Sequence, residues 1–173
     1  SDHAATFIKY AIELTTGRPV ASLGPSLASI YHAPMKLAGS AAIAISQSGK
    51  SPDIVAMTQA ATQAGALTLA LTNTPASPMA QASSHAIDIQ AGPELAVAAT
   101  KSYFNSIVAG LALLAEWVDD DALKRALQDL PALCSRAVNL DGTDLAGLLG
   151  DADSLFILGL GPATDAFGIF DGN

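Results

Sequence analysis

Short apolar runs that alternate with helical stretches constrain the fold of this chain more than any other feature. Ala41–Ile45 is apolar without interruption, and residues 66–71 are apolar at all but one position. Such runs are typical of parallel strands that are buried on both faces. Between them, residues 52–64 carry apolar side chains at helical spacing, with Ser51 before them and Gly65 after them. The pattern predicts an α/β protein in which helices cover a parallel sheet.

Extended along the chain, the pattern predicts a three-layer αβα fold with a five-stranded parallel sheet of flavodoxin-like type. Further strands are expected at residues 20–23 and 86–89, and the first strand is expected upstream of Ser1. Helices are expected over residues 4–14, 26–36, 52–64, 78–84, 94–118 and 122–139. The chain opens inside a helix and stops after a strand and a turn, so both ends look like cuts through a larger protein.

Three consecutive aspartates at residues 119–121 mark a boundary in this pattern. We expect a first domain over residues 1–120 and a helical linker over residues 121–153. The apolar run at residues 155–158 is followed by a glycine-rich turn. Residues 154–173 therefore look like the start of a second, incomplete α/β domain.

Composition excludes several classes of function. The net charge is −8 and the eight Lys and Arg residues form no basic stripe, which argues against nucleic acid as a partner. No uninterrupted apolar run reaches about 18 residues, so no membrane span is expected. The single Cys134 excludes an intrachain disulfide and fits the cytoplasm. His32 and His85 have no Cys or carboxylate at ligand spacing, so we expect neither a metal nor another cofactor.

The turn after Ala41–Ile45 carries the features of a binding site. It reads Ser46-Gln47-Ser48-Gly49-Lys50-Ser51 and leads into a predicted helix. The first turn of a helix has unpaired N–H groups and a positive dipole, and a glycine lets the backbone approach a ligand closely. Serine hydroxyls add donors, and ligands of open parallel sheets bind at the carboxyl ends of the strands. The turn therefore predicts a phosphate-binding loop.

Two other interpretations of this turn need consideration. Composition alone also suits an ordinary capped turn between a strand and a helix. A nucleotide P-loop would share the residues Gly49-Lys50-Ser51, but it requires a glycine five positions earlier, where Ala44 stands. The P-loop is therefore rejected. Lys50 could add charge to a bound phosphate or point to solvent.

Three segments together resemble the sugar isomerase (SIS) domain family. The stretch from Ile45 to Asp53 resembles the family's signature. The segment Glu94-Leu95-Ala96-Val97-Ala98-Ala99-Thr100-Lys101 resembles Glu-x-x-Val-Ala-Ser-Thr-Lys of the isomerase half of glucosamine-6-phosphate synthase and its two-domain relatives. Residues 1–5 resemble the end of the turn after the family's first strand. The three segments occur in the expected order within about residues 1 to 140.

The resemblance implies roles for individual residues. The phosphate of a sugar ligand would be bound by Ser46, Gln47, Ser48, Gly49 and Ser51. The sugar would be contacted by Ser1, by the main chain of Val97 and at Ala99, where the family has a serine, so one hydroxyl contact is missing. His3 and Glu94 are further candidates, although a solvent-facing histidine and a carboxylate that stabilises a helix dipole are simpler roles for them.

As implied by the resemblance, the parent protein is an isomerase, aminotransferase or deaminase acting on hexose or amino-sugar 6-phosphates. Moving a carbonyl along a sugar requires a general base, and the family takes this glutamate and a ring-opening histidine from the second domain. This chain has no Glu after Glu116 and no His after His85, so its catalytic residues are unknown and expected elsewhere. The alternative is a non-catalytic module that senses a phosphosugar in a regulator. A flavodoxin-like nucleotide binder would need motifs that are absent from this sequence. The apolar stretch at residues 104–118 also predicts a homodimer.

Overall fold

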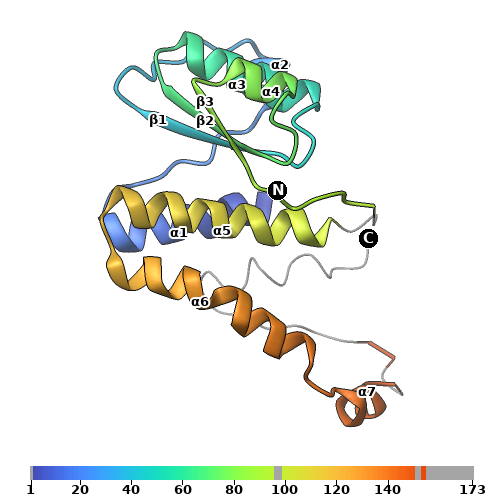
Figure 1. The fold of residues 1–173 in the computed structure, drawn as a ribbon. Helices are drawn as coiled ribbons and strands as arrows, with labels where there is room; N and C mark the ends of the chain where they lie inside the picture. Colours follow the sequence, from blue (N-terminus) through green and yellow to red (C-terminus); the bar gives the residue numbers. More distant parts are fainter. Residues whose placement is uncertain (1, 96–98, 151–152, 155–173) are drawn as a thin grey trace.

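The apolar runs of the sequence form a parallel sheet in the computed structural model, which describes residues 2–95, 99–150 and 153–154. Within these residues the sheet has three strands, β1 (Ala41–Ile45), β2 (Leu67–Thr72) and β3 (His85–Asp88), in the order β1-β2-β3. Both pairs are parallel, with Ala41 opposite Leu67 and Leu69 opposite His85. All three carboxyl ends therefore meet at one edge of the sheet (Figure 1).

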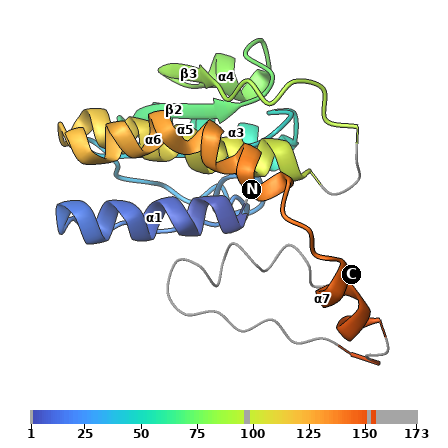
Figure 2. The same cartoon turned by 60° about the horizontal axis from the view of Figure 1, so that its bottom comes forward.

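Helices cover both faces of this sheet, as the sequence pattern predicts. On one face lie α3 (Pro52–Gln63), α4 (Pro78–Ala82) and the short α2 (Ser26–Ser29), and on the other lie α1 (Asp2–Thr16) and α5 (Thr100–Trp117). α6 (Asp121–Val138) packs along α5 on the side away from the sheet, and α7 (Thr143–Leu149) follows it (Figures 1 and 2). The expected three-layer α/β arrangement is confirmed for the described residues.

The core lies between the sheet and the α1–α5 layer. Its buried members are Ile45, Leu71 and Ile89 from the sheet side and Ile8, Ile12 and Leu114 from the helices. The two helices approach closely, because a Cβ atom on Gly110 would lie 2.3 Å from Cδ1 of Ile8. The buried face of α5 is thus built partly from small residues, and its larger Phe104 and Trp117 remain 43% and 53% exposed.

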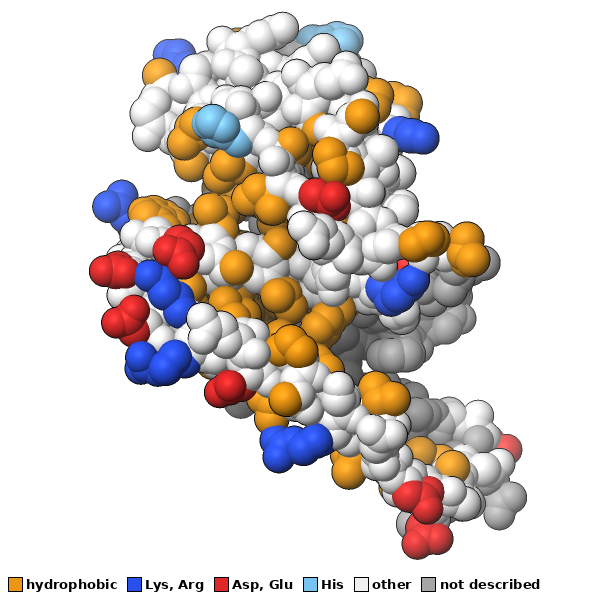
Figure 3. All heavy atoms as spheres, viewed as in Figure 1, with side chains coloured by type: hydrophobic (Ala, Val, Ile, Leu, Met, Phe, Trp, Pro, Cys, Tyr) orange, Lys and Arg blue, Asp and Glu red, His pale blue; other side chains and the backbone are white. Residues whose placement is uncertain are grey.

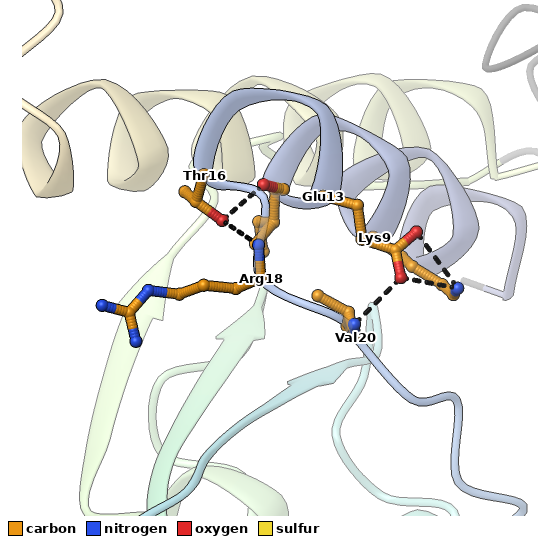
Figure 4. A network of polar contacts seen from close by, with 6 residues as sticks. Lys9, Glu13, Thr16, Arg18 and Val20 are labelled. Carbon is orange, nitrogen blue, oxygen red and sulfur yellow. Dashed lines mark hydrogen bonds and ion pairs between the residues drawn. The ribbon is translucent and has the colours of Figure 1, made fainter.

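The strand expected at residues 20–23 is absent from the structure, where this segment has no regular hydrogen-bonding pattern. Instead, the N–H of Val20 donates to the Glu13 carboxylate near the end of α1 (2.9 Å), and Lys9 Nζ lies 3.1 Å from the same carboxylate (Figure 4). The Val20 N–H bond, followed by the Lys9 contact, lowers the pKa of Glu13. The prediction of a strand here was wrong because Glu13 draws this backbone donor to α1. The described sheet has three strands, so the expected five are not confirmed. The strand expected at residues 155–158, in the second domain, lies outside the described residues.

Two expected helices are shorter than predicted. The helix expected over residues 26–36 ends at Ser29, and His32 beyond it has a φ of 45°, outside the right-handed helical region. The helix expected from residue 94 begins at Thr100. Among the described residues, no helix is both long enough and apolar enough to span a membrane.

Candidate phosphate-binding site

The serine loop (residues 46–51) lies at the carboxyl edge of the sheet, between the end of β1 and the start of α3. It is tied to the neighbouring strand β2. The N–H of Ser46 donates to the carbonyl of Leu71 (3.1 Å), and the carbonyl of Gln47 accepts from the N–H of Asn73 (3.0 Å). The Thr72 hydroxyl donates to the same Gln47 carbonyl (3.2 Å). The loop's path is therefore determined by the end of β2.

Gly49 holds the other side of the loop against α4. Its backbone has a φ of +59°, in the left-handed region that favours glycine, and its carbonyl accepts from the N–H of Met79 (3.0 Å). A Cβ atom at this position would lie 2.2 Å from Oγ of Ser77. Ser77 is buried and caps α4 by accepting from the N–H of Ala80 (3.3 Å). The glycine is thus needed for packing as well as for backbone conformation.

The serines of the loop combine internal bonds with available donors. Ser46 Oγ accepts from the N–H of Gly49 (3.1 Å), and Ser48 Oγ accepts from the N–H of Lys50 (3.4 Å). An accepting hydroxyl keeps its hydrogen to donate to an anion. Ser51 occupies the N-cap position of α3, and its side chain makes no capping bond within the described part of the helix. Three hydroxyls and a helix N-terminus therefore share one six-residue turn, which suits a phosphate ester.

The remaining loop residues differ in exposure. Gln47 is half-buried, as are Ser46 and Ser48, whereas Lys50 and Ser51 are exposed. The exposure of Lys50 agrees with a side chain that points to solvent. Ser51 is the exposed N-cap residue of α3, so its hydroxyl is accessible to solvent.

The second predicted segment is anchored through Glu94. Its Oε2 accepts from both the N–H (2.8 Å) and the hydroxyl (3.0 Å) of Ser102, in the first turn of α5. These bonds, the backbone N–H first, hold the pKa of Glu94 below its ordinary value. Glu94 therefore stabilises the start of α5 from eight residues away. The ionised carboxylate is a weak base, which is poorly suited to abstracting a proton from carbon.

The other predicted sugar contacts are placed only in part. Ser1 and Val97 lie outside the described residues. Ala99 is exposed and stands at the N-cap position of α5, and His3 is half-buried in the first turn of α1. The described residues thus place the serine loop, Glu94 and the start of α5, and they leave the sugar side of the site to be tested.

One residue of this region was missed by the sequence analysis. Asn73 directly follows β2, and its side chain donates to the carbonyl of Gly92 (2.7 Å) and accepts from the N–H of Ala91 (2.9 Å). An open hollow of about 500 Å³ lies here, lined by Asn73, Asp88, Gln90, Gly92 and Pro93. The available signal was an asparagine at a strand's carboxyl end, followed by Thr74 and Pro75.

An open parallel sheet with a serine- and glycine-rich turn at a helix N-terminus defines a class of α/β domains suited to binding phosphate. The SIS domain model matches residues 1–116, more than half of the chain, and the chain belongs to this family. The resemblance inferred from the serine loop and the Glu94 segment is therefore confirmed at the level of the family.

Several similar proteins are enzymes named for phosphosugar substrates. Glutamine–fructose-6-phosphate aminotransferase (isomerizing) of Symbiobacterium thermophilum is 34% identical over an alignment of 171 residues. The alignment covers 91% of this chain and 27% of that enzyme. The enzyme of the same name from Halobacterium salinarum is 38% identical over 130 residues, covering 68% of this chain and 21% of that enzyme.

Solved structures show the same relationship. A structure assigned as a phosphosugar isomerase from Silicibacter pomeroyi has 54% identity and a TM-score of 0.83, covering 86% of this chain and 46% of that one. Another so assigned, from Bacillus subtilis, has 26% identity and a TM-score of 0.62, with the same coverage. The chain therefore spans under a third of the matched aminotransferases and just under half of these two solved chains.

Replacing Gly49 by alanine should destabilise the protein. The left-handed backbone should cost about 1 kcal/mol and the overlap with Ser77 about 2 kcal/mol more. Gly39→Ala is the matched control, because Gly39 has a φ of +79° and no atom within 4 Å of the added Cβ. Urea unfolding should show the larger loss for Gly49→Ala. Equal losses would contradict the packing of Ser77 against the loop.

The stabilising effect of Glu94 should depend on pH. Its pKa is lowered from an ordinary value of 4.5, so the folded state favours the ionised form. This stabilisation is complete above the pKa of the unfolded chain and disappears as pH falls through the lower, folded pKa. Glu94→Gln should lower the melting temperature at pH 7, and its difference from the wild type should shrink below about pH 4.5. A difference that stays constant from neutral to strongly acidic pH would contradict the stabilising role of the ionised Glu94 carboxylate.

Proposed function

We propose that this chain is the phosphosugar-binding domain of an isomerase or aminotransferase that acts on hexose or amino-sugar 6-phosphates. The observation that carries the proposal is the serine loop, held at the carboxyl edge of the sheet by β2 and α4. Membership of the SIS family and similarity to enzymes named for fructose 6-phosphate support the choice of substrate class. These same relatives favour an enzyme over a non-catalytic sensor as the parent protein.

In this proposal the phosphate group lies against the serine loop. The hydroxyls of Ser46, Ser48 and Ser51 donate to phosphate oxygens, and the N-terminal end of α3 supplies backbone donors and a favourable dipole. Donors fixed by the fold cost little entropy when the ligand binds. Gln47, which precedes Ser48 and is half-buried, is assigned to a sugar hydroxyl or to holding the loop.

The sugar then extends toward the segment that begins at Glu94. We assign its contacts to Ser1, to the main chain of Val97 and to the region of Ala99, with His3 as a further candidate. The missing hydroxyl at Ala99 weakens one polar contact, which would shift the preference among sugar phosphates.

Proton transfer requires groups other than those described. Glu94 is committed to Ser102 and has a lowered pKa, so we assign it a structural role. We propose that the general base lies in a second SIS domain of the parent protein. The first domain would span residues 1–120, residues 121–153 would link the two, and residues 154–173 would begin the second.

Fructose 6-phosphate should bind the intact protein in isothermal titration calorimetry. Ser48→Ala and Ser51→Ala should each weaken binding about tenfold, because a hydrogen bond to a charged group contributes about 1.5 kcal/mol or more. Ser135→Ala, an exposed serine on α6, is the matched control and should bind like the wild type. Absence of both heat and a thermal shift at millimolar ligand would overturn the proposal.

We also propose that the parent protein is a homodimer. Hydrophobic side chains gather across the middle of one face, over α5 and α6 (Figure 3). These side chains border a groove of about 520 Å³, which is lined by Phe104, Val108, Leu127, Leu130 and Cys134, among others. Hydrophobic side chains that gather on an exposed face are typical of a protein–protein interface.

Sedimentation velocity of the intact protein at micromolar concentration should therefore show a dimer. Leu130→Glu, on α6 in the lining of this groove, should shift the distribution toward monomer because it would place a charge in the interface. A wild-type protein that sediments as a single monomeric species would contradict the dimer.

A further inference from the structure

We infer that Asn73 is a positioning residue that couples the serine loop to the segment leading to Glu94. The inference rests on the proposed function, and it assigns a role to a residue that no sequence motif singled out. Asn73 reaches both segments at once. Its backbone N–H donates to the carbonyl of Gln47 in the serine loop (3.0 Å), and its side chain bonds to residues 91 and 92.

Both polar atoms of the Asn73 side chain are used on the backbone of the same turn. Nδ2 donates to the carbonyl of Gly92 (2.7 Å), and Oδ1 accepts from the N–H of Ala91 (2.9 Å). A carboxamide supplies a donor and an acceptor from two separate atoms, whereas an ionised carboxylate only accepts. An aspartate would keep the acceptor and would set a second oxygen against the Gly92 carbonyl.

The turn that Asn73 holds includes a non-glycine residue in an unfavourable backbone conformation. Gln90 has a φ of 52° and Gly92 a φ of 67°, both in the left-handed region. A non-glycine residue keeps this conformation only where its surroundings enforce it, and such positions concentrate at ligand-binding sites. Here the Asp88 carboxylate accepts from the N–H of Gln90 (2.9 Å), and Asn73 holds the next two residues.

The segment beyond the turn is anchored at its far end as well. Lys101 Nζ donates to the carbonyl of Pro93, and Glu94 is bonded to Ser102. Residues 93 and 94 are thus anchored on α5, whereas residues 91 and 92 are anchored on Asn73, whose own N–H donates to Gln47 in the serine loop. Loss of the Asn73 side chain would leave the serine loop's own bonds in place. It would release residues 91 and 92, which begin the segment that leads to Glu94 (residues 91–95, the sugar-side segment).

Two ligands separate this role from a general loss of stability. Inorganic phosphate tests the serine loop alone, and fructose 6-phosphate tests the loop together with the sugar-side segment. Both are titrated calorimetrically into the intact wild-type protein, Asn73→Ala, Asn73→Asp and Thr62→Val. Thr62→Val is the matched control, because it removes a hydroxyl that bonds to the Ala82 carbonyl (2.8 Å) and contacts Thr68, at the opposite end of β2.

Asn73→Ala should keep its affinity for inorganic phosphate within about threefold of the wild type and lose about tenfold or more for fructose 6-phosphate. Asn73→Asp should lose at least as much, because its carboxylate repels the Gly92 carbonyl. Thr62→Val should lower the melting temperature while keeping the ratio of the two affinities.

An unchanged ratio in both Asn73 variants, in a protein whose wild type binds both ligands, would overturn the inference alone. The inference would also be overturned if Thr62→Val lowered the ratio of the two affinities as much as the Asn73 variants do, because the effect would then follow stability. A wild-type protein that binds neither ligand would overturn the proposed function and this inference with it.

Discussion

The hydrogen bonds that tie the serine loop to the ends of neighbouring elements are the constraint on which the site depends. The loop connects β1 to α3, yet its path is determined by the end of β2 and the residue after it, through Leu71, Thr72 and Asn73, and by the start of α4. These bonds join segments more than twenty residues apart in the sequence. A loop held in this way presents its donors in one arrangement before a ligand arrives, so little conformational entropy is lost on binding.

Two glycines matter for the site because each allows a close contact that a larger residue would block. Gly49 permits the loop to touch Ser77, and Gly110 permits α5 to approach Ile8 on the other face of the sheet. The first contact places the serine loop, and the second places the helix whose N-terminus carries Ser102 and therefore Glu94. The two predicted halves of the ligand site are thus positioned by close packing on opposite faces of one sheet.

Local chemistry made much of this predictable from the sequence. The run Ala41–Ile45, Ser51 with Pro52, and Gly65 specify a buried strand and a bounded helix, and the structure has both. Long-range contacts were less accessible. The segment at residues 20–23 has strand-like composition, but Glu13 draws the Val20 N–H toward α1. The bonds of Asn73 depend on the parallel pairing of β2 with β3, which no local pattern of residues specifies.

The proposed function assigns binding and proton transfer to different parts of the parent protein. A phosphate site needs many weak donors held rigidly, and backbone amides and serines supply them without any change of protonation. Proton transfer at a sugar carbon needs a group whose pKa lies near the working pH. Glu94 is the carboxylate nearest in sequence to Val97 and Ala99, and its bonds to Ser102 move its pKa in the opposite direction. An element that holds the substrate still and a second that supplies the base can each be optimised alone, because rigid donors and a perturbed carboxyl require different surroundings.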